Sequence, residues 1–419
     1  MFDITKFKNE NSAILKAIYG EKAEQMTKRI ADAVEKFVSL YGDGDVSVFS
    51  VPGRSEICGN HTDHNRGEVF AASIDLDIVT VARATDGECV RVTSEGFSEC
   101  NVGVYDLSPV KSDEGTSAAL IRGVLDGFVR RGFRTVPFDC YMTSSVLGGS
   151  GLSSSAAFEI MISNIENHFA NGGKIDATTL SQISQYAENA HFGKPCGLMD
   201  QMACAWGGFV YIDFSDPRSP LCESTPLDIG AAGYALCIVS TGGSHADLTD
   251  DYAAVPAEMK AVAAFFGKDA LRAVSREDVM NNIPALREKV GDRAILRALH
   301  FFDENDRVRA MQKALGAGDI DAFLNIINAS GQSSAMMLQN YFTPKAPQEQ
   351  GITLAYAVAK ELLGGEGAVR VHGGGFAGTI QAFVPKKSLE SFVSGMESAF
   401  GKGSVSVLSV RPFGAIMFK

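Results

Sequence analysis

The spacing of hydrophobic residues changes repeatedly along the first half of the chain. Residues 22–41 carry an apolar side chain every three or four positions, which predicts an amphipathic helix. Residues 46–51 alternate instead, and this predicts a strand that ends at Pro52-Gly53. By the same criteria, further helices are predicted at 116–129, 158–168 and 178–191, and further strands at 69–81, 90–92, 138–146 and 209–214.

The second half of the chain is mostly helical in pattern. Helices are predicted at 251–265, 286–300, 304–315, 319–331 and 350–363, and short strands near 379–384 and 404–418. Because both halves mix strands with helices, we expect an α+β protein of two domains. The stretch 215–220 combines two prolines with turn-forming residues and is the best candidate for a linker. It divides the chain into an N-terminal domain, 1–216, and a C-terminal domain, 217–419.

Composition and charge narrow the function classes. Of 419 residues, 45% are hydrophobic and 21% are charged, as in a packed globular protein. The net charge of −12 argues against a general binder of nucleic acids or anionic membranes. No run approaches the roughly 18 apolar residues of a transmembrane helix. The eight cysteines form no C-x-x-C pair, so we expect reduced thiols in a cytoplasmic protein.

Glycine and serine are concentrated between a predicted strand and a predicted helix, at Gly148, Gly149, Ser150, Gly151, Leu152, Ser153, Ser154 and Ser155. Glycines let the backbone approach an anion, and helix N-terminal amides favour a polyphosphate. A serine-capped helix after a flexible turn is the structural alternative. The stretch is neither a Walker A loop, since no Gly-Lys-Ser/Thr follows, nor a dinucleotide-binding loop, since Ser154 stands at the third glycine.

Two other segments carry candidate chemistry. The stretch 52–65 gathers many groups that bond hydroxyls, which fits a polar cup for a sugar. Metal binding by His61, Asp63 and His64 and a merely solvated loop are its alternatives. In Cys196-Gly197-Leu198-Met199-Asp200-Gln201, Asp200 is either a functional acid or a helix N-cap. His372-Gly373-Gly374-Gly375 resembles the oxyanion loop of esterases, but the absence of a G-x-S-x-G nucleophile motif argues against a serine hydrolase.

Four stretches, taken in order, resemble the motifs of the GHMP kinases. They are Gly53 to His64, Gly149 to Ala156, Cys196 to Gln201 and Gly373 to Gly378. Within that family the resemblance is to the galactokinases, and it spans residues 52–378. It implies a two-domain GHMP kinase fold with the active site between the domains. It also implies ATP-dependent phosphorylation of the anomeric hydroxyl of galactose.

The resemblance implies a role for each matched residue. Asp200 would be the catalytic acid–base residue, and Arg54 beside it would keep it ionised. The sugar-binding residues would be Asn60, His61, Asp63, Gly197 and Tyr252. The ATP phosphates would lie on residues 148–155, and Ser155 with Glu188 would hold Mg²⁺.

Departures from the family pattern leave the sugar open. Asn60 replaces an acid that helps galactokinases bind the 6-hydroxyl, Glu56 replaces an asparagine and His64 replaces a tyrosine. An amide does not repel a carboxylate, so a sugar that differs at carbon 6, such as galacturonate or arabinose, is an alternative. A non-catalytic sugar sensor of the same fold and a kinase for a non-sugar substrate are further alternatives. We expect a monomer with no nucleic-acid or membrane partner.

Overall fold

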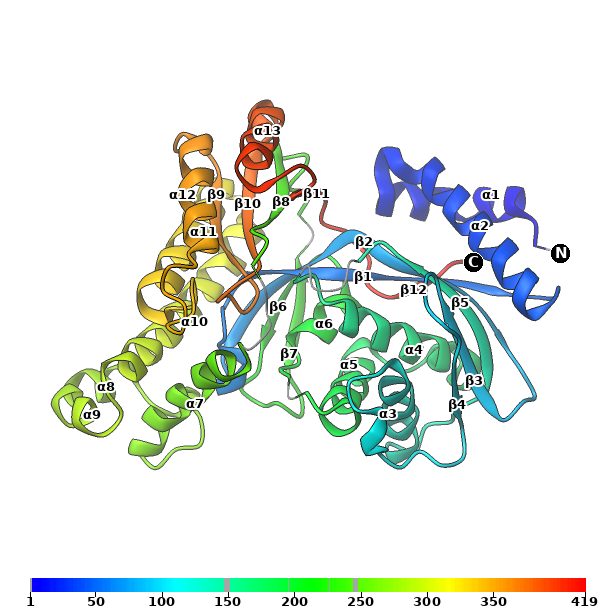
Figure 1. Cartoon of the computed structure of the whole chain (residues 1–419), viewed down its shortest axis with the longest axis horizontal. Coiled ribbons are helices and arrows are strands. Elements are labelled where there is room, and N and C mark those ends of the chain that lie inside the picture. The colour runs from blue at the N-terminus through cyan, green and yellow to red at the C-terminus, as the bar shows by residue number, and fades with distance from the viewer. Residues whose placement is uncertain (1, 147–150, 195, 226, 244–247) are drawn as a thin grey trace.

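Two β-sheets organise the molecule (Figure 1). The computed structural model describes residues 2–146, 151–194, 196–225, 227–243 and 248–419. The first sheet has eight strands, β1 (Ser47–Cys58), β2 (Glu68–Ala84), β3 (Cys89–Ser94), β4 (Cys100–Gly103), β5 (Phe138–Ser144), β6 (Phe209–Asp213), β7 (Leu221–Thr225) and β12 (Ile416–Met417). The second sheet has four, β8 (Tyr234–Ser240), β9 (Ala368–His372), β10 (Thr379–Pro385) and β11 (Val405–Leu408).

Helices cover both sheets. Those around the first sheet are α1 (Ile4–Tyr19), α2 (Ala23–Tyr41), α3 (Ser117–Arg130), α4 (Ser154–Asn171), α5 (Ala177–Ala187) and α6 (Met199–Trp206). Those of the second half are α7 (Thr249–Phe265), α8 (Arg276–Asn281), α9 (Ile283–Lys289), α10 (Asp292–Ala317), α11 (Ile320–Ser333), α12 (Gly351–Leu363) and α13 (Leu389–Phe400). Within the described ranges, no helix is both long and apolar enough to cross a membrane.

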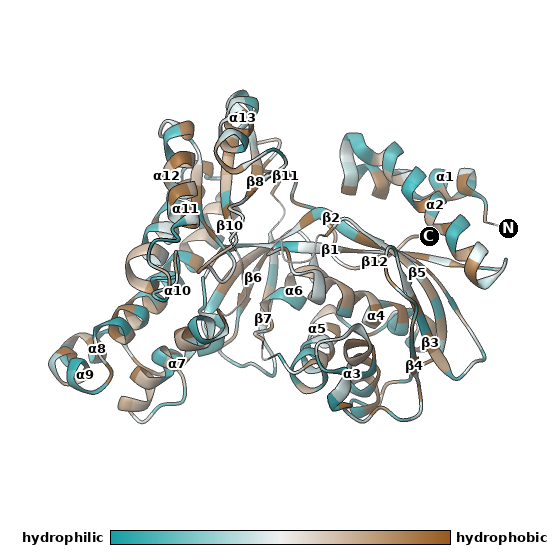
Figure 2. Ribbon diagram, in the orientation of Figure 1, coloured by the Kyte–Doolittle hydropathy of each residue, from teal (hydrophilic) through white to brown (hydrophobic). Residues whose placement is uncertain are grey.

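The first sheet buries side chains on both faces. Successive strand residues point to opposite faces, so Phe49 packs with Phe128 of α3 and Ile160 of α4, while Val48 packs with Phe37 of α2. Helices α3–α6 therefore lie below the sheet in Figure 1, and α1 and α2 lie above it. The hydropathy colouring agrees, since apolar residues follow the strands and the inner helix faces (Figure 2).

The second sheet is a layer between two pairs of helices. Cys237 and Val239 of β8 face α12 and α13, while Leu236 and Ile238 face α10 and α11. The apolar cluster that contains Leu236 and Ile238 also contains Ile57 of β1 and Phe70 of β2 from the first sheet. One apolar core thus joins the ends of β1 and β2 to the second half of the chain.

Several predicted elements differ in the structure. Strand β1 does not end at Pro52-Gly53 but continues to Cys58, because bulges at Pro52/Arg54 and Glu56/Cys58 absorb the irregular residues. The helix predicted at 286–300 is interrupted at Val290–Gly291, so its first residues belong to α9. Its remainder and the helix predicted at 304–315 form one helix, α10. The predicted linker 215–220 instead joins β6 to its antiparallel partner β7. Since β7 and β12 belong to the first sheet, a boundary at 216/217 does not follow the sheets, and the two-domain division stays a prediction.

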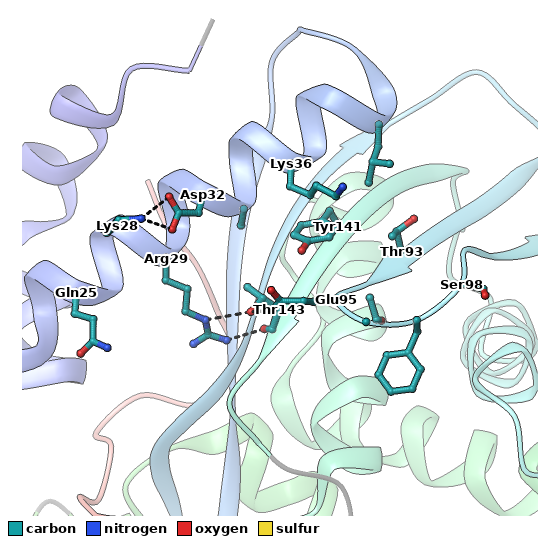
Figure 3. Close-up of a pocket in the computed structure, with 15 residues that line it drawn as sticks. Gln25, Lys28, Arg29, Asp32, Lys36, Thr93, Glu95, Ser98, Tyr141 and Thr143 are labelled. Carbon is teal, nitrogen blue, oxygen red and sulfur yellow. Dashed lines mark hydrogen bonds and ion pairs between the residues drawn. The ribbon is translucent and has the colours of Figure 1, made fainter.

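A groove of about 1030 Å³ lies between α2 and the β3–β5 side of the first sheet (Figure 3). Several of its charged side chains already have partners. Lys28 pairs with Asp32, and Arg29 donates to the carbonyl of Thr143 at 2.7 Å. None of the residues that line the groove belongs to the four motifs. The groove is therefore a surface feature separate from the candidate site.

Four segments meet at the buried carboxylate of Asp77 on β2. Tyr19 of α1, Ser50 of β1 and Arg411 near the C-terminus donate to Oδ2, and Arg29 of α2 donates to Oδ1 at 2.7 Å. Asp77 and Arg411 are both fully buried. One acid therefore fixes α1, α2 and the C-terminal segment on the sheet.

We expect Asp77→Asn to lower the free energy of unfolding by about 3–5 kcal/mol, because two arginines lose their counter-charge in the interior. Urea unfolding followed by circular dichroism measures the loss. Asp32→Asn is the matched control, since it breaks only the exposed pair with Lys28 and should change stability by less than about 1 kcal/mol. Equal stability of the two variants would contradict the anchoring role of Asp77.

Candidate active site

A paired arginine and aspartate form the centre of the candidate site. Arg54, on β1, donates from Nε to Oδ1 of Asp200 at 2.7 Å and from Nη2 to Oδ2 at 2.9 Å. Its third nitrogen, Nη1, donates to the carbonyl of Gly151 at 2.6 Å. The arginine is almost entirely buried, whereas 34% of the Asp200 side chain is exposed. The pair is therefore held from behind and open on one side.

The environment of Asp200 keeps its carboxyl ionised. Burial by itself raises the pKa of this group, but the charge and hydrogen bonds of Arg54, together with a bond from Ser153, outweigh burial and leave the pKa below its usual value. Oδ2 accepts from both Arg54 and Ser153, whereas among the described residues Oδ1 accepts only from Arg54. Because a carboxylate oxygen accepts two bonds, Oδ1 retains a lone pair for a substrate hydroxyl.

The N-cap alternatives for Asp200 and for the serine loop do not fit the structure. Leu198 is the N-cap of α6, and Asp200 lies in the first turn with its carboxylate turned to Arg54. Ser153 is the N-cap of α4, but its hydroxyl makes no capping bond and donates to Asp200 instead. The amides that begin α4 are thus not capped by Ser153, and a dipole-favoured anion site remains in front of them.

The loop before α4 packs directly on β1. The amide of Arg54 donates to the carbonyl of Leu152 at 3.2 Å. A Cβ on Gly53 would lie 2.8 Å from that same carbonyl, so only glycine permits this approach. The predicted phosphate-binding residues Gly148, Gly149 and Ser150 lie outside the described residues. Gly151, Leu152, Ser153, Ser154 and Ser155 lie within them, beside the Arg54–Asp200 pair.

The predicted metal-binding residues are neighbours. The hydroxyl of Ser155, on α4, donates to Oε1 of Glu188 at 3.3 Å. Glu188 is nearly fully buried in the π-helical turn Glu188–Phe192 that follows α5. A second carboxyl, Glu159, is fully buried one turn along α4, and its Oε1 has no partner among the described residues. Hydroxyl and carboxylate oxygens are the ligands that Mg²⁺ prefers, so the residues present fit the ion.

Asp63 and Gly197, two predicted sugar-binding residues, touch each other. A Cβ on Gly197 would lie 1.8 Å from Oδ2 of Asp63, so glycine is required where the carboxylate passes. Asp63 Oδ1 accepts from the backbone amide of His64 at 2.9 Å. The metal site suggested for His61, Asp63 and His64 is wrong, because no group of three such ligands is arranged around a metal position in the described part of the chain.

The other three predicted sugar-binding residues hold one glycine loop. Asn60 donates to the carbonyl of Gly373 at 2.9 Å, and Tyr252 donates to that of Gly375 at 2.9 Å. Between them, Nε2 of His61 lies 3.0 Å from the carbonyl of Gly374. Burial lowers the pKa of His61 to about 4, so the ring is neutral and donates. Three consecutive carbonyls of the fourth motif are thereby fixed.

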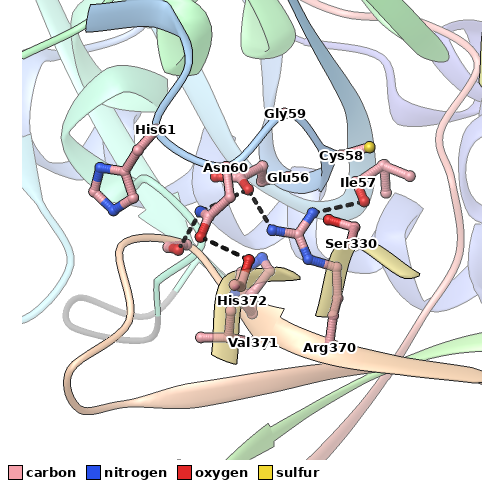
Figure 4. Close-up of polar contacts among 12 residues, drawn as sticks. Glu56, Ile57, Cys58, Gly59, Asn60, His61, Ser330, Arg370, Val371 and His372 are labelled. Carbon is pink, nitrogen blue, oxygen red and sulfur yellow. Dashed lines mark hydrogen bonds and ion pairs between the residues drawn. The ribbon is translucent and has the colours of Figure 1, made fainter. Parts of the chain in front are cut away.

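Asn60 also belongs to a buried polar network (Figure 4). Its amide donates to Glu56 at 2.9 Å, and its oxygen accepts from Asn340 at 2.8 Å. Glu56 in turn pairs at 2.6 Å with Arg370, which reaches across from β9 (Figure 4). Asn60 is fully buried, and both of its amide hydrogens are used. The hypothesis that Asn60 contacts the carbon-6 group directly therefore does not fit this geometry.

Comparisons with known proteins place the chain in a family. Residues 35–84 match a family model described as the galactokinase galactose-binding signature, and residues 119–208 match the GHMP kinases N terminal domain. A galactokinase of Streptomyces coelicolor is 30% identical over 90% of this chain and 94% of its own length. The chain belongs to the galactokinases. A galactokinase of Actinobacillus pleuropneumoniae serotype 5b is 31% identical over 85% of this chain and 90% of its own length.

Solved structures agree on the fold. The Lactococcus lactis galactokinase complexed with galactose superposes with a TM-score of 0.77 at 23% identity, over 91% of this chain and 98% of that one. The Methanococcus jannaschii mevalonate kinase superposes with a TM-score of 0.60 at 11% identity, over 88% and 99%. The α+β GHMP kinase fold expected from the motifs is confirmed, and use of ATP follows from membership of this family.

Three contacts in the galactokinase site were not predicted. They are the bond of Ser153 to Asp200, the pairing of Lys194 with Glu188 at 3.2 Å, and the link of Gln201 to two glutamates. Gln201 directly follows Asp200 within the third motif, and this position was the only indication in the sequence that Gln201 belongs to the site. Lys194 lies in no motif, so nothing in the sequence marked it.

Replacement of Arg54 should change the pH dependence of catalysis. The depressed pKa of Asp200 means that its carboxylate persists as pH falls, until the pH reaches that low value. In Arg54→Gln, burial without the counter-charge raises the pKa, so the acidic limb of the kcat/KM–pH profile should move to higher pH. Arg218→Gln, at an exposed arginine, is the control. An unmoved acidic limb would contradict the coupling.

Asn60→Glu separates the two roles considered for this residue. In the structure it would place a second buried carboxylate beside Glu56, so we expect a loss of about 2–4 kcal/mol in stability. The ratio of kcat/KM for galactose over galacturonate should change less than about threefold, which corresponds to less than 1 kcal/mol. Asn101→Glu, at an exposed asparagine that also bonds a glutamate, is the control. If Asn60→Glu keeps wild-type stability and raises this kcat/KM ratio more than threefold, Asn60 contacts the carbon-6 group directly after all.

Proposed function

We propose that the protein phosphorylates the anomeric hydroxyl of galactose with ATP, giving galactose 1-phosphate and ADP. The observation that carries this proposal is the Arg54–Asp200 pair, held against Gly151 and Ser153 beside the start of α4. A carboxylate that is ionised and open on one side stands next to a helix N-terminus suited to phosphates. Membership of the galactokinases supplies the substrate class.

Asp200 takes the proton in this reaction. Its free lone pair on Oδ1 accepts the hydrogen of the anomeric hydroxyl, and the sugar oxygen then forms a bond to the γ-phosphorus. The bond from that phosphorus to the β–γ bridging oxygen breaks, and the electron pair leaves with ADP. Arg54 keeps Asp200 charged before the transfer and stabilises its orientation through two parallel hydrogen bonds.

Residues of α4 and its loop bind the nucleotide in this proposal. Amides of the 148–155 stretch cradle the phosphates, since helix N-termini favour anions. Ser155 and Glu188 hold Mg²⁺, which neutralises phosphate charge when it is bound. Phosphoryl transfer mainly requires positioning and charge stabilisation, and these residues provide both.

Asp63 and the Gly197 backbone are the proposed direct contacts for sugar hydroxyls. Their close approach supports a shared wall near Asp200. His61, Asn60 and Tyr252 act on the sugar through the 373–375 loop that they hold. A non-catalytic sugar sensor is the second candidate, but the presence of Ser155, Asp200 and Arg54 in bonded positions favours the enzyme.

We further propose that the protein is a cytoplasmic monomer. All eight cysteines are free thiols in the structure, which supports a reducing compartment. Light scattering after size exclusion tests the monomer.

Asp200→Asn should lower kcat by about 10²–10⁴, the scale of an acid–base group. The assay is ADP release from Mg-ATP with galactose, and with galacturonate, arabinose and mevalonate as alternatives. ATP affinity should change much less than kcat, because an amide oxygen can still accept the bond from Ser153 that joins Asp200 to the phosphate loop. Asp216→Asn, at an exposed aspartate, should retain wild-type turnover.

Two results would contradict the proposed function. Near-wild-type turnover by Asp200→Asn would remove Asp200 from the chemistry. Saturable sugar binding by the wild-type protein, with no phosphorylated product, would favour the sensor.

A further inference from the structure

The glutamine that follows Asp200 bridges two acids. Gln201 of α6 is fully buried, and its Nε2 donates to Oε2 of Glu188 at 3.0 Å and to Oε2 of Glu159 at 3.1 Å. An amide nitrogen carries two hydrogens, so each acid receives one. Gln201 thus joins α6 to α4 and to the π-helical turn after α5.

Ser155 and the two acids meet at one face of α4. Ser155 and Glu159 are four residues apart on α4 and therefore share one helix face. Glu188 approaches that face from its own turn, with Oε1 at the Ser155 hydroxyl and Oε2 at Gln201. The side chains form a closed chain of contacts, Ser155 to Glu188 to Gln201 to Glu159, which returns to α4.

The two carboxylate oxygens of Glu188 therefore have different hydrogen-bond partners. Oε1 faces Ser155 and also accepts from Lys194 at 3.2 Å, whose side chain is largely exposed. Oε2 is tied to Gln201 in the interior. Without Gln201, this oxygen would lose its amide donor, leaving only the weaker thiol donor of Cys196 near the Glu188 carboxylate, and the carboxylate could rotate away from Ser155.

We propose that Gln201, anchored by Glu159, is a positioning residue that holds Glu188 for the divalent cation. The proposal rests on the proposed function, in which Ser155 and Glu188 are the ligands. Residues behind a metal ligand that fix its orientation are worth about 10–100-fold in metal affinity. Because Gln201 and Asp200 are adjacent on α6, one short helix orients both the metal ligand and the proton acceptor.

The experiment measures binding of Mn²⁺, by electron paramagnetic resonance, to the whole protein with a non-hydrolysable ATP analogue. Gln201→Met keeps the size of the side chain but removes the donor, and it should weaken Mn²⁺ binding about 10–100-fold. Gln201→Asn keeps an amide but is too short to bridge both acids, and it should weaken binding in the same direction. This second variant serves if the first does not fold.

Kinetics give an independent measure. In Gln201→Met the Mg²⁺ concentration for half-maximal rate should rise by a similar factor. The KM for sugar and the kcat at saturating Mg²⁺ should stay within about threefold of wild type, because Gln201 touches neither substrate; threefold is less than 1 kcal/mol. Gln185→Met is the matched control, since Gln185 lies nearby on α5 but donates to the carbonyl of Cys196. It should leave both metal measurements unchanged.

Failure of this inference can be separated from failure of the proposed function. If Ser155→Ala weakens Mn²⁺ binding while both Gln201 variants bind as tightly as wild type, Gln201 is only structural and the inference is overturned. A lower melting temperature with unchanged metal dependence has the same meaning. If the wild-type protein binds no Mn²⁺ with the nucleotide, or Ser155→Ala has no effect, the metal site itself is wrongly assigned.

Discussion

The ion pair between the buried Arg54 and the partly exposed Asp200 is the constraint on which the site depends. Removing a charge from water costs several kcal/mol, and only well-made hydrogen bonds offset that cost. Here the guanidinium uses all three of its nitrogens, two on Asp200 and one on the carbonyl of Gly151. The pair therefore fixes β1, α6 and the phosphate loop relative to one another.

Many residues of the candidate site could be predicted, because they lie within short motifs that are recognisable in the sequence. Arg54, Asp200, Ser155 and Glu188 stand where the family pattern puts them, and the structure brings them together in two bonded pairs. The N-cap interpretation of Asp200 is wrong because a local motif does not predict which distant side chain will pair with a carboxylate. The partner of Asp200 is Arg54, 146 residues away in the sequence.

The errors of the sequence analysis have the same origin. Pro52 and Gly53 suggested the end of a strand, yet pairing with β2 carries the chain through a bulge to Cys58, since tertiary pairing overrides local propensity. Asn60 lies in a motif shared with sugar-binding proteins, but Glu56, Asn340 and Gly373 occupy its amide. The residue types in the sequence identify candidate sugar-binding residues. Only the folded structure shows which of these candidates has a polar atom left to bind a substrate.

Strand β1 passes through both halves of the molecule. It contributes Phe49 to the core under the first sheet, Arg54 to the site and Ile57 to the core shared with the second sheet. A strand anchored at both ends resists separation of those cores but still permits bending at its two bulges. One of these bulges lies at Arg54 itself, so bending of β1 for substrate entry can leave the Arg54–Asp200 pair intact, and Asp200 is then ionised when the sugar arrives.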